Sequence, residues 1–493
     1  MVSSTAIDAL TSALVARFLR ANNYSESLQA FIREAGLPVD AGQASGDDTN
    51  HWTIQGLLEE KKTFDHTANF ERYGKGNKET DSWSVPAPSK ATIVNTPTSS
   101  NLLAASVDSW HLPEDDAEAA TAAPVIISTG ADRQVHLSKT TKNHGSITSF
   151  SSVSDSPVLS YVSILKGRYV LMTNMSGGLI LLHGSRIVDS RKDHSKYAVK
   201  VVAYDEKGET DSSSQFWVAT AGWDATVYLY CVNVPNGEDA PVIGEPVAHI
   251  KLTTNPESLV FVRHIDTNNL ILLVSRRDST HIYYYQVASS PKEASNLDQN
   301  ESDIPSCRLL GQQNLAPHSN AWIGFSPAHM ALSPHDPGLL AVATSTLPHM
   351  KMIIVRLLFP SVAPLATRDP SEDAPVTQAS QALESLALQN REDAAILIQA
   401  NTFAPQTAYS TPQVAWRPDG SGVWVNGDDG MVRGIETKTG KVVATLKNGH
   451  EPGCKVRTIW AGYVDVQSEG EETTQEEWVV SGGFDKRLIL WKV

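Results

Sequence analysis

The sequence feature that most constrains the fold is a pair of short strands joined by a turn that carries an aspartate. This pattern recurs in three segments, Val125–Leu137, Trp217–Tyr230 and Trp478–Trp491. Each segment has a run of β-branched and aromatic residues, then small residues, an aspartate and a second apolar run, which is typical of two strands joined by a tight turn. The recurrence predicts an all-β repeat protein in which each repeat contributes a small antiparallel sheet.

The last copy is the most complete. Gly449-His450 precedes its first strand, and Ser481, Asp485 and Trp491 follow at fixed positions. These residues match the His, Ser/Thr, Asp and Trp positions of the WD-repeat family, and the three segments together resemble its β-propeller unit. The resemblance implies a hydrogen-bonded structural network in the last repeat and a weaker version earlier in the chain. The network residues it implies are His194, Thr220, Asp224, His450, Ser481, Asp485 and Trp491.

Counting strand triplets gives seven blades, with six or eight as alternatives. Degenerate copies of the repeat are found at Glu257–Val287, Ala328–Leu357 and Thr411–Ile435. We therefore predict a mainly β fold, a seven-bladed WD-repeat β-propeller over residues 89–493. The last copy ends on a third strand, so we expect Ala91–Asn95 to supply the fourth and to remove the exposed sheet edge.

The first 37 residues have a different pattern. Apolar residues recur at helical spacing on both sides of Asn22-Asn23, which predicts a hairpin of two short helices over residues 6–37. So small a unit buries too little surface to be stable alone and needs a partner. The spacing closely resembles the LisH motif, a dimerisation element, although Asn23 stands where that family usually has glycine. The resemblance implies that the protein forms a homodimer through Leu14, Phe18, Leu19, Tyr24, Leu28, Phe31 and Ile32. The alternative is a helical hairpin that docks on its own chain.

Two further segments separate or interrupt these units. Residues 38–88 form a polar linker with a short amphipathic helix predicted over 52–64. A long insertion at about 360–393 is rich in Pro, Ser and Asp, and we expect it to be disordered, with the Ala-Leu stretch Ala379–Leu388 as an alternative docking helix.

Composition excludes several functional classes. The net charge of −15 argues against direct nucleic-acid binding, because phosphate binding needs a basic surface. No phosphate-binding loop or metal-binding motif is present, so no cofactor or metal is expected. The three cysteines lack disulfide or zinc spacing, and no apolar run is long enough to cross a membrane. We therefore expect no membrane partner and a cytoplasmic and/or nuclear protein.

His450, Ser481 and Asp485 are also the residue types of a catalytic triad. No nucleophile elbow or oxyanion hole accompanies them, so we predict a structural network and no enzyme. In a propeller, the residue before each turn aspartate faces one end of the ring, where exposed aromatic rings beside cations favour protein binding. The candidate binding residues are Arg133, Trp223, Phe484 and Lys486. The alternative is that each ring folds back over its own blade.

Together these features predict a non-enzymatic scaffold that dimerises through the LisH hairpin and binds other proteins through the propeller. The alternative function is a substrate receptor of a ubiquitin ligase complex. That role predicts a blade ending similar to Trp-Asp-x-Arg. The actual endings do not fit, for example Leu137-Ser138-Lys139 and Trp491-Lys492-Val493.

Overall fold

The computed structural model describes most of the chain. The described residues are 4–43, 53–54, 83, 85–111, 124–141, 144–206, 213–235, 240–287, 304–317, 324–360, 378–467 and 473–493. The chain divides into two compact units. One comprises residues 1–76 with 370–388, and the other comprises residues 77–369 with 389–493.

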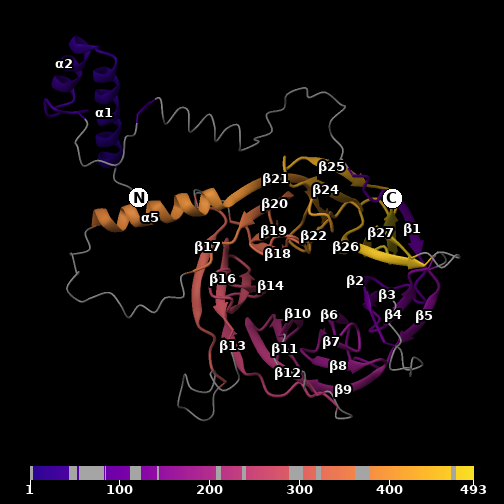
Figure 1. The fold of residues 1–493 in the computed structure, drawn as a ribbon. Helices are drawn as coiled ribbons and strands as arrows, with labels where there is room; N and C mark the ends of the chain where they lie inside the picture. Colours follow the sequence, from indigo (N-terminus) through magenta and orange to yellow (C-terminus); the bar gives the residue numbers. More distant parts are fainter. Residues whose placement is uncertain are drawn as a thin grey trace. The chain divides into compact units, whose positions relative to one another are not determined.

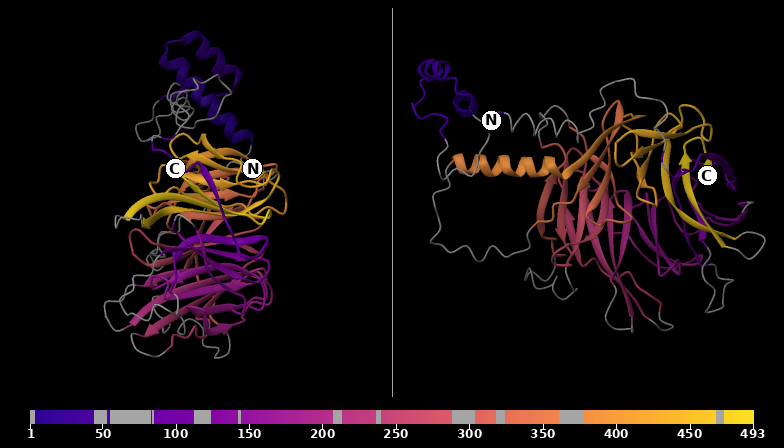
Figure 2. Two further views of the ribbon diagram at one scale, coloured as in Figure 1. Left: turned by 90° about the vertical axis from the view of Figure 1, so that its right-hand side faces the viewer. Right: turned by 45° about the horizontal axis from the view of Figure 1, so that its top comes forward.

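The N-terminal unit begins with a helical hairpin, as the sequence pattern predicts. Helix α1 spans Ser4–Ala21, helix α2 spans Ser25–Glu34, and the two lie side by side (Figure 2). Asn23 between them adopts a positive φ of 60°. This left-handed conformation is tolerated by asparagine better than by most residues other than glycine, so Asn23 can take the place of the usual glycine.

The second unit is a ring of seven four-stranded antiparallel sheets, which we number as blades 1 to 7 in chain order (Figure 1). Blade 1 contains β2 (Leu102–Ser109), β3 (Pro124–Gly130), β4 (Val135–Lys139) and β5 (Ser146–Phe150), and blade 2 contains β6 (Val158–Ile164), β7 (Tyr169–Asn174), β8 (Leu179–His183) and β9 (Arg186–Arg191). Blade 3 contains β10 (Ala198–Glu206), β11 (Ser213–Gly222), β12 (Thr226–Pro235) and β13 (Ala248–Lys251). Blade 4 contains β14 (Pro256–Arg263), β15 (Leu270–Arg276), β16 (His281–Gln286) and β17 (Leu309–Asn314). The last three are blade 5 with β18 (Pro327–Leu332), β19 (Leu339–Thr344), β20 (His349–Arg356) and β21 (Ile396–Pro405); blade 6 with β22 (Val414–Trp416), β23 (Gly422–Asn426), β24 (Val432–Glu436) and β25 (Val442–Leu446); and blade 7 with β26 (Val456–Gln467), β27 (Thr473–Gly483), β28 (Leu488–Lys492) and β1 (Lys90–Val94).

Blade 7 is completed by a strand from the other end of the propeller sequence. Strand β1 pairs antiparallel with β28, with Lys90 opposite Lys492 and Val94 opposite Leu488. Both the predicted number of seven blades and the predicted closing strand at Ala91–Asn95 are confirmed. The ring is therefore closed by main-chain hydrogen bonds between its first and last strands.

The hydrophobic core lies between the blades. Many strands carry apolar residues on both faces, and these residues pack against the neighbouring blades. Ile127 and Leu137 of blade 1, for example, belong to the same buried cluster as Leu182 of blade 2. Four of the largest fully buried side chains are tryptophans, Trp217, Trp424, Trp478 and Trp491. The hydrophobic clusters are therefore shared between neighbouring blades.

The innermost strands share an irregularity. In six blades, the pairing of the first strand with the second shifts by one residue near its start. In blade 7, for example, Val456 pairs with Gly483 and Thr458 pairs with Gly482, so Arg457 between them is unpaired. Such β-bulges bend a strand and re-aim its side chains. The residues at the bulged position are Leu103, Leu159, Val199, Glu257, Ala328 and Arg457.

A tryptophan from the segment before β1 packs into blade 6. The ring of Trp83 lies 5.0 Å from that of Trp424, and the Arg417 guanidinium stacks over it at 4.5 Å. A methyl group added at Gly422 or Gly434 would come within 2.4 or 2.2 Å of Trp83, so only glycine leaves room there. Arg417 is itself fully buried, and its charge is balanced by Glu477.

The long insertion differs from its predicted disorder in its second half. Residues Gln378–Ala395 form helix α5, which contains the Ala-Leu stretch Ala379–Leu388. Alanine, leucine, glutamine and glutamate are good helix formers, and Glu392 anchors the end of the helix by accepting a hydrogen bond from the Asn314 N–H at 2.7 Å. Residues 361–377, like almost all of the helix predicted over 52–64, lie outside the described residues. No helix among the described residues is long and apolar enough to cross a membrane.

Candidate functional site

One end of the ring carries the turns between the second and third strands of each blade and the loops between blades, and we call this end the turn face. In blades 1, 3, 6 and 7 the turn aspartate accepts a hydrogen bond from the N–H two residues further on, at 3.2–3.3 Å. The residue between them has a positive φ, as at Arg133 (69°), Ala225 (58°) and Lys486 (65°). The turn therefore places the residue before the aspartate and the residue after it at the ring surface.

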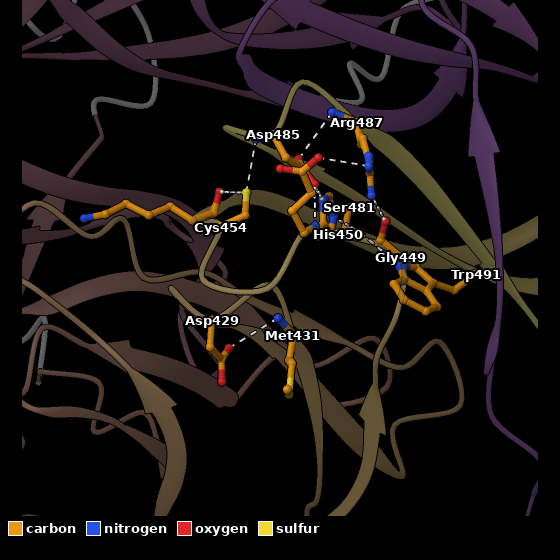
Figure 3. Close-up of polar contacts among 11 residues, drawn as sticks. Asp429, Met431, Gly449, His450, Cys454, Ser481, Asp485, Arg487 and Trp491 are labelled. Carbon is orange, nitrogen blue, oxygen red and sulfur yellow. Dashed lines mark hydrogen bonds and ion pairs between the residues drawn. The ribbon is translucent and has the colours of Figure 1, made fainter.

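The complete network of the last repeat is shown in Figure 3. His450 Nδ1 lies 3.0 Å from both carboxylate oxygens of Asp485, and its Nε2 lies 2.8 Å from Ser481 Oγ. Trp491 Nε1 donates to the same Ser481 Oγ at 2.9 Å. The Glu451 N–H donates to Asp485 at 2.9 Å. The network thus joins β27, β28 and the loop before β26.

The protonation of this network follows from its donors. Burial alone would raise the pKa of Asp485, but hydrogen bonds from His450 and from two backbone N–H groups outweigh burial and lower that pKa to about 2. The ionised carboxylate only accepts, so His450 Nδ1 carries the proton and Nε2 accepts from the Ser481 hydroxyl. Ser481 accepts in turn from Trp491. The side-chain polar atoms of His450, Ser481, Asp485 and Trp491 therefore all have partners within this network.

The same donor order occurs in a Ser-His-Asp triad, but access differs. Ser481 is 0% exposed and His450 is 4% exposed, so a substrate carbonyl has no path to the serine oxygen. The Trp491 N–H also occupies that oxygen. The geometry fits a cross-link between strands, which is the role that the WD-repeat resemblance implies.

Blade 3 contains a second network of the same design. His194 Nδ1 lies 3.0 Å from Asp224 Oδ1, and His194 Nε2 lies 2.9 Å from Thr220 Oγ1. Burial opposes ionisation of Asp224, yet hydrogen bonds from His194 and from backbone N–H groups lower its pKa. Tyr228 packs edge-on against the His194 ring. Tyr230 stands six residues after the aspartate, as Trp491 does in blade 7, and its hydroxyl donates to Asp193 at 2.9 Å.

Cys454 adds a thiol to the blade 7 network, which the sequence pattern does not predict. Its sulfur accepts from the Asp485 N–H at 3.1 Å, and the ligand-type atoms of His450, Cys454 and Asp485 lie within 4.8 Å of one another. Burial, and then the charge of Asp485, raise the pKa of the thiol to about 11. A protonated thiol and a histidine nitrogen that already donates to Asp485 are poor metal ligands, so hydrogen bonding accounts for this cluster.

The candidate binding residues are spread over three turns. Trp223 lies in blade 3, Phe484 and Lys486 in blade 7, and Arg133 in blade 1, which adjoins blade 7. Trp223 is 40% exposed and Phe484 is 42% exposed. The structure therefore places Phe484 and Lys486 on a blade next to that of Arg133, whereas Trp223 lies two blades beyond Arg133.

Trp223 has an aromatic neighbour that the sequence reasoning missed. Tyr197, in the loop before β10, lies 5.3 Å from Trp223 between ring centroids, and it is 38% exposed. The Trp223 N–H also donates to the Tyr197 carbonyl at 2.9 Å. The available signal was an aromatic residue directly before the first strand of a blade, at the same end of the ring as the turn.

The dimerisation residues implied by the LisH resemblance all lie on the hairpin. Leu28 is buried, Tyr24 is 53% exposed, and the others are partly buried. Phe18 and Tyr24 lie 6.4 Å apart between ring centroids. The hairpin thus leaves much of its apolar surface uncovered by its own two helices.

Comparison with known proteins agrees with both units. Residues 9–43 match the family model described as UCP007778, LisH domain, and residues 116–466 match the one described as UCP007778, beta-propeller domain. The chain is also similar to the uncharacterized protein YGR117C of Saccharomyces cerevisiae, with 23% identity over 370 residues, which cover 70% of this chain and 74% of the yeast protein. LisH and propeller domains generally mediate protein–protein interactions. The chain therefore belongs to the UCP007778 family, with a LisH domain followed by a β-propeller domain.

Proposed function

We propose that this protein is a non-enzymatic scaffold that self-associates through its LisH hairpin and binds partner proteins through the turn face of its propeller. The observation that carries the proposal is the exposed aromatic pair Tyr197 and Trp223 on the turn face of the propeller. By contrast, Ser481, His450 and the Asp485 side chain, which are the residue types of a catalytic triad, are buried. Large aromatic rings that are held rigidly and left partly in water are typical of binding hot spots. A propeller with a LisH domain is typically an interaction fold.

The charges at the turns of blades 1 and 7 indicate the kind of partner segment. Arg133 and Lys486 are exposed at the positive-φ turn position, next to Ala131 and Phe484 respectively. Cations on the face of a protein with net charge −15 favour an acidic partner segment with an apolar anchor. Trp223 and Phe484 would supply the apolar contacts.

Substitution of the exposed rings tests the turn face. We expect W223A and F484A to lose partners in affinity purification of the full chain, with Y463A as the matched control. Tyr463 is 48% exposed and lies in β26, away from the turn at which β27 ends. Partner sets that are unchanged in W223A and F484A would move the binding site to another surface.

Self-association follows from the incomplete burial of the hairpin. Phe18 and Phe31 remain partly exposed in a single copy, and pairing two hairpins would cover them. In light scattering we expect a particle of twice 53.4 kDa for the unmutated chain and 53.4 kDa for F18D or F31D. Q29D adds the same charge at an exposed position and should stay dimeric. A monomeric unmutated chain would refute this part of the proposal.

The alternative role, a substrate receptor of a ubiquitin ligase, rests on the domain combination alone, and no contact described above favours it. We also infer a cytoplasmic and/or nuclear location. The inference rests on the three cysteines, which are all free thiols and so fit a reducing compartment.

A further inference from the structure

A cavity of about 260 Å³ lies on the outer rim of the ring, between blade 6 and the segment that leads into blade 7. One wall is formed by residues 443–446 of β25, the outermost strand of blade 6 (Figure 1). The other wall is formed by Trp83 and residues 85–89, which precede β1. Most of the lining side chains are apolar, and none is ionisable. The cavity therefore suits an uncharged, apolar group.

The cavity follows the edge of β25 and does not lie over one of its faces. Ala444, Thr445 and Leu446 pair regularly with residues 434–432 of β24, so their side chains alternate between the two faces of the sheet. All three nevertheless line the cavity. The cavity is therefore a gap beside a strand, which is the position that a further extended chain takes in a sheet.

The edge of β25 that borders the cavity has no strand partner among the described residues. β25 is the last strand in the order of its sheet and pairs with β24 alone. The facing segment is a poor partner, because Pro86 and Pro88 have no N–H to donate. The Ser89 N–H donates to the Lys492 carbonyl at 2.7 Å, and the Pro86 carbonyl accepts from Arg417 Nη2 at 3.3 Å. The main-chain groups along this edge of β25 are thus left for another chain to pair with.

The two stretches of chain beside the cavity are basic. Residues 437–448, which contain β25, and residues 85–94 have four lysines and no aspartate or glutamate, although the whole chain has a net charge of −15. The lysines are Lys90, Lys438, Lys441 and Lys447, and all four are exposed. A second copy of this chain would bring the same lysines, so two β25 edges repel each other. An acidic segment of a different protein has the complementary charge.

We propose that the cavity and the edge of β25, together called the rim groove, bind an extended acidic segment of a partner protein by strand addition. The main chain of the segment pairs with β25, one of its apolar side chains fills the cavity, and its acidic side chains meet the lysines. The rim groove uses none of the turn-face residues. It therefore extends the proposed scaffold function with a second binding surface on the same propeller.

Selection from a phage-displayed library of random ten-residue peptides tests the rim groove. The bait is the full chain carrying W223A and F484A, so that the proposed turn-face site does not dominate the selection. We expect enriched peptides in which acidic residues alternate with valine, isoleucine or leucine. The synthetic consensus peptide should bind the bait in fluorescence anisotropy. Hydrogen exchange of the main-chain amides of β25 should slow when the peptide binds.

Two variants of the bait test the residues around the groove. V85E and K447E should each weaken peptide binding about tenfold or more, because each adds a carboxylate that repels the acidic peptide. Val85 is 52% exposed and Lys447 is exposed, so both variants should melt at the temperature of the bait. The matched controls are V242E and K251E in blade 3, where Val242 is 61% exposed and Lys251 is exposed at the end of β13. Both controls should bind the peptide as the bait does.

Three results would overturn the proposal. They are a selection that enriches no peptide, a consensus peptide that binds V85E and K447E within about twofold of the bait, and slowed exchange that falls outside β25. None of these results bears on the turn face, because W223A and F484A test that site separately in affinity purification.

Discussion

Asp485 offers the sharpest test of how the last blade is held. Its side chain is 1% exposed and accepts hydrogen bonds from His450 Nδ1 and from the N–H groups of Glu451 and Arg487. These donors lower its pKa from 3.8 to about 2. At about 1.4 kcal/mol per pH unit, the ionised carboxylate contributes roughly 2 to 3 kcal/mol to the free energy of unfolding at neutral pH.

The sign of the pH dependence follows from the direction of this change. Because the pKa is lower in the folded state, the stabilisation is complete well above pH 4 and is lost as the pH falls toward 2. The substitution D485N keeps the size of the side chain and removes the charge. We therefore expect D485N to lower the free energy of unfolding by about 2 to 3 kcal/mol at pH 7 and by less than about 1 kcal/mol near pH 2.

Urea denaturation followed by tryptophan fluorescence measures both values, since Trp491 belongs to the same network. D266N is the matched control, because Asp266 is an exposed turn residue whose carboxylate accepts no hydrogen bond from the described residues. Its change should stay within about 0.5 kcal/mol. A D485N effect below 0.5 kcal/mol at pH 7, or a loss that is equally large at pH 2, would refute the reasoning.

Two further expectations concern the segment that packs against blade 6. W83A should cost about 3 to 5 kcal/mol in urea denaturation, since it empties the space beside Gly422 and Gly434, and a cost below 1 kcal/mol would show that the ring is dispensable. The buried Arg417 donates to Glu477 at 2.9 and 2.6 Å, so R417M or E477L alone should lower the free energy of unfolding by about 3 to 5 kcal/mol, because each leaves the other charge buried without a partner. The double variant should recover most of that stability. If the effects of the two substitutions simply add, this account is wrong.

The sequence predicts those parts of the fold in which the determining residues lie close together in the chain. The turn around Asp485 is an example, because the aspartate, the small residues before it and the strand after it all fall within about a dozen positions. His450 lies further away, but its resemblance to a known repeat position identifies it. The seven-bladed ring follows from repeating such local units.

Other features depend on register between strands and are not visible in a single sequence. Arg457 reads as an ordinary charge on a strand until the shift in pairing between Val456 and Thr458 leaves it unpaired at a bulge. Trp83 reads as an isolated tryptophan in a polar segment, and its site exists only because Gly422 and Gly434 lie side by side in a sheet. Tyr197 becomes informative only when its turn partner is known.

The pairing of β1 with β28 has a consequence for how the protein is synthesised. At a translation rate of about 5 to 20 residues per second, the roughly 400 residues between these strands take about 20 to 80 seconds to appear. During that time β1 has been made but its partner has not. Strand β1 is only five residues long, begins with a lysine and exposes its first four side chains. These are the traits that keep a waiting edge strand from pairing with another nascent chain.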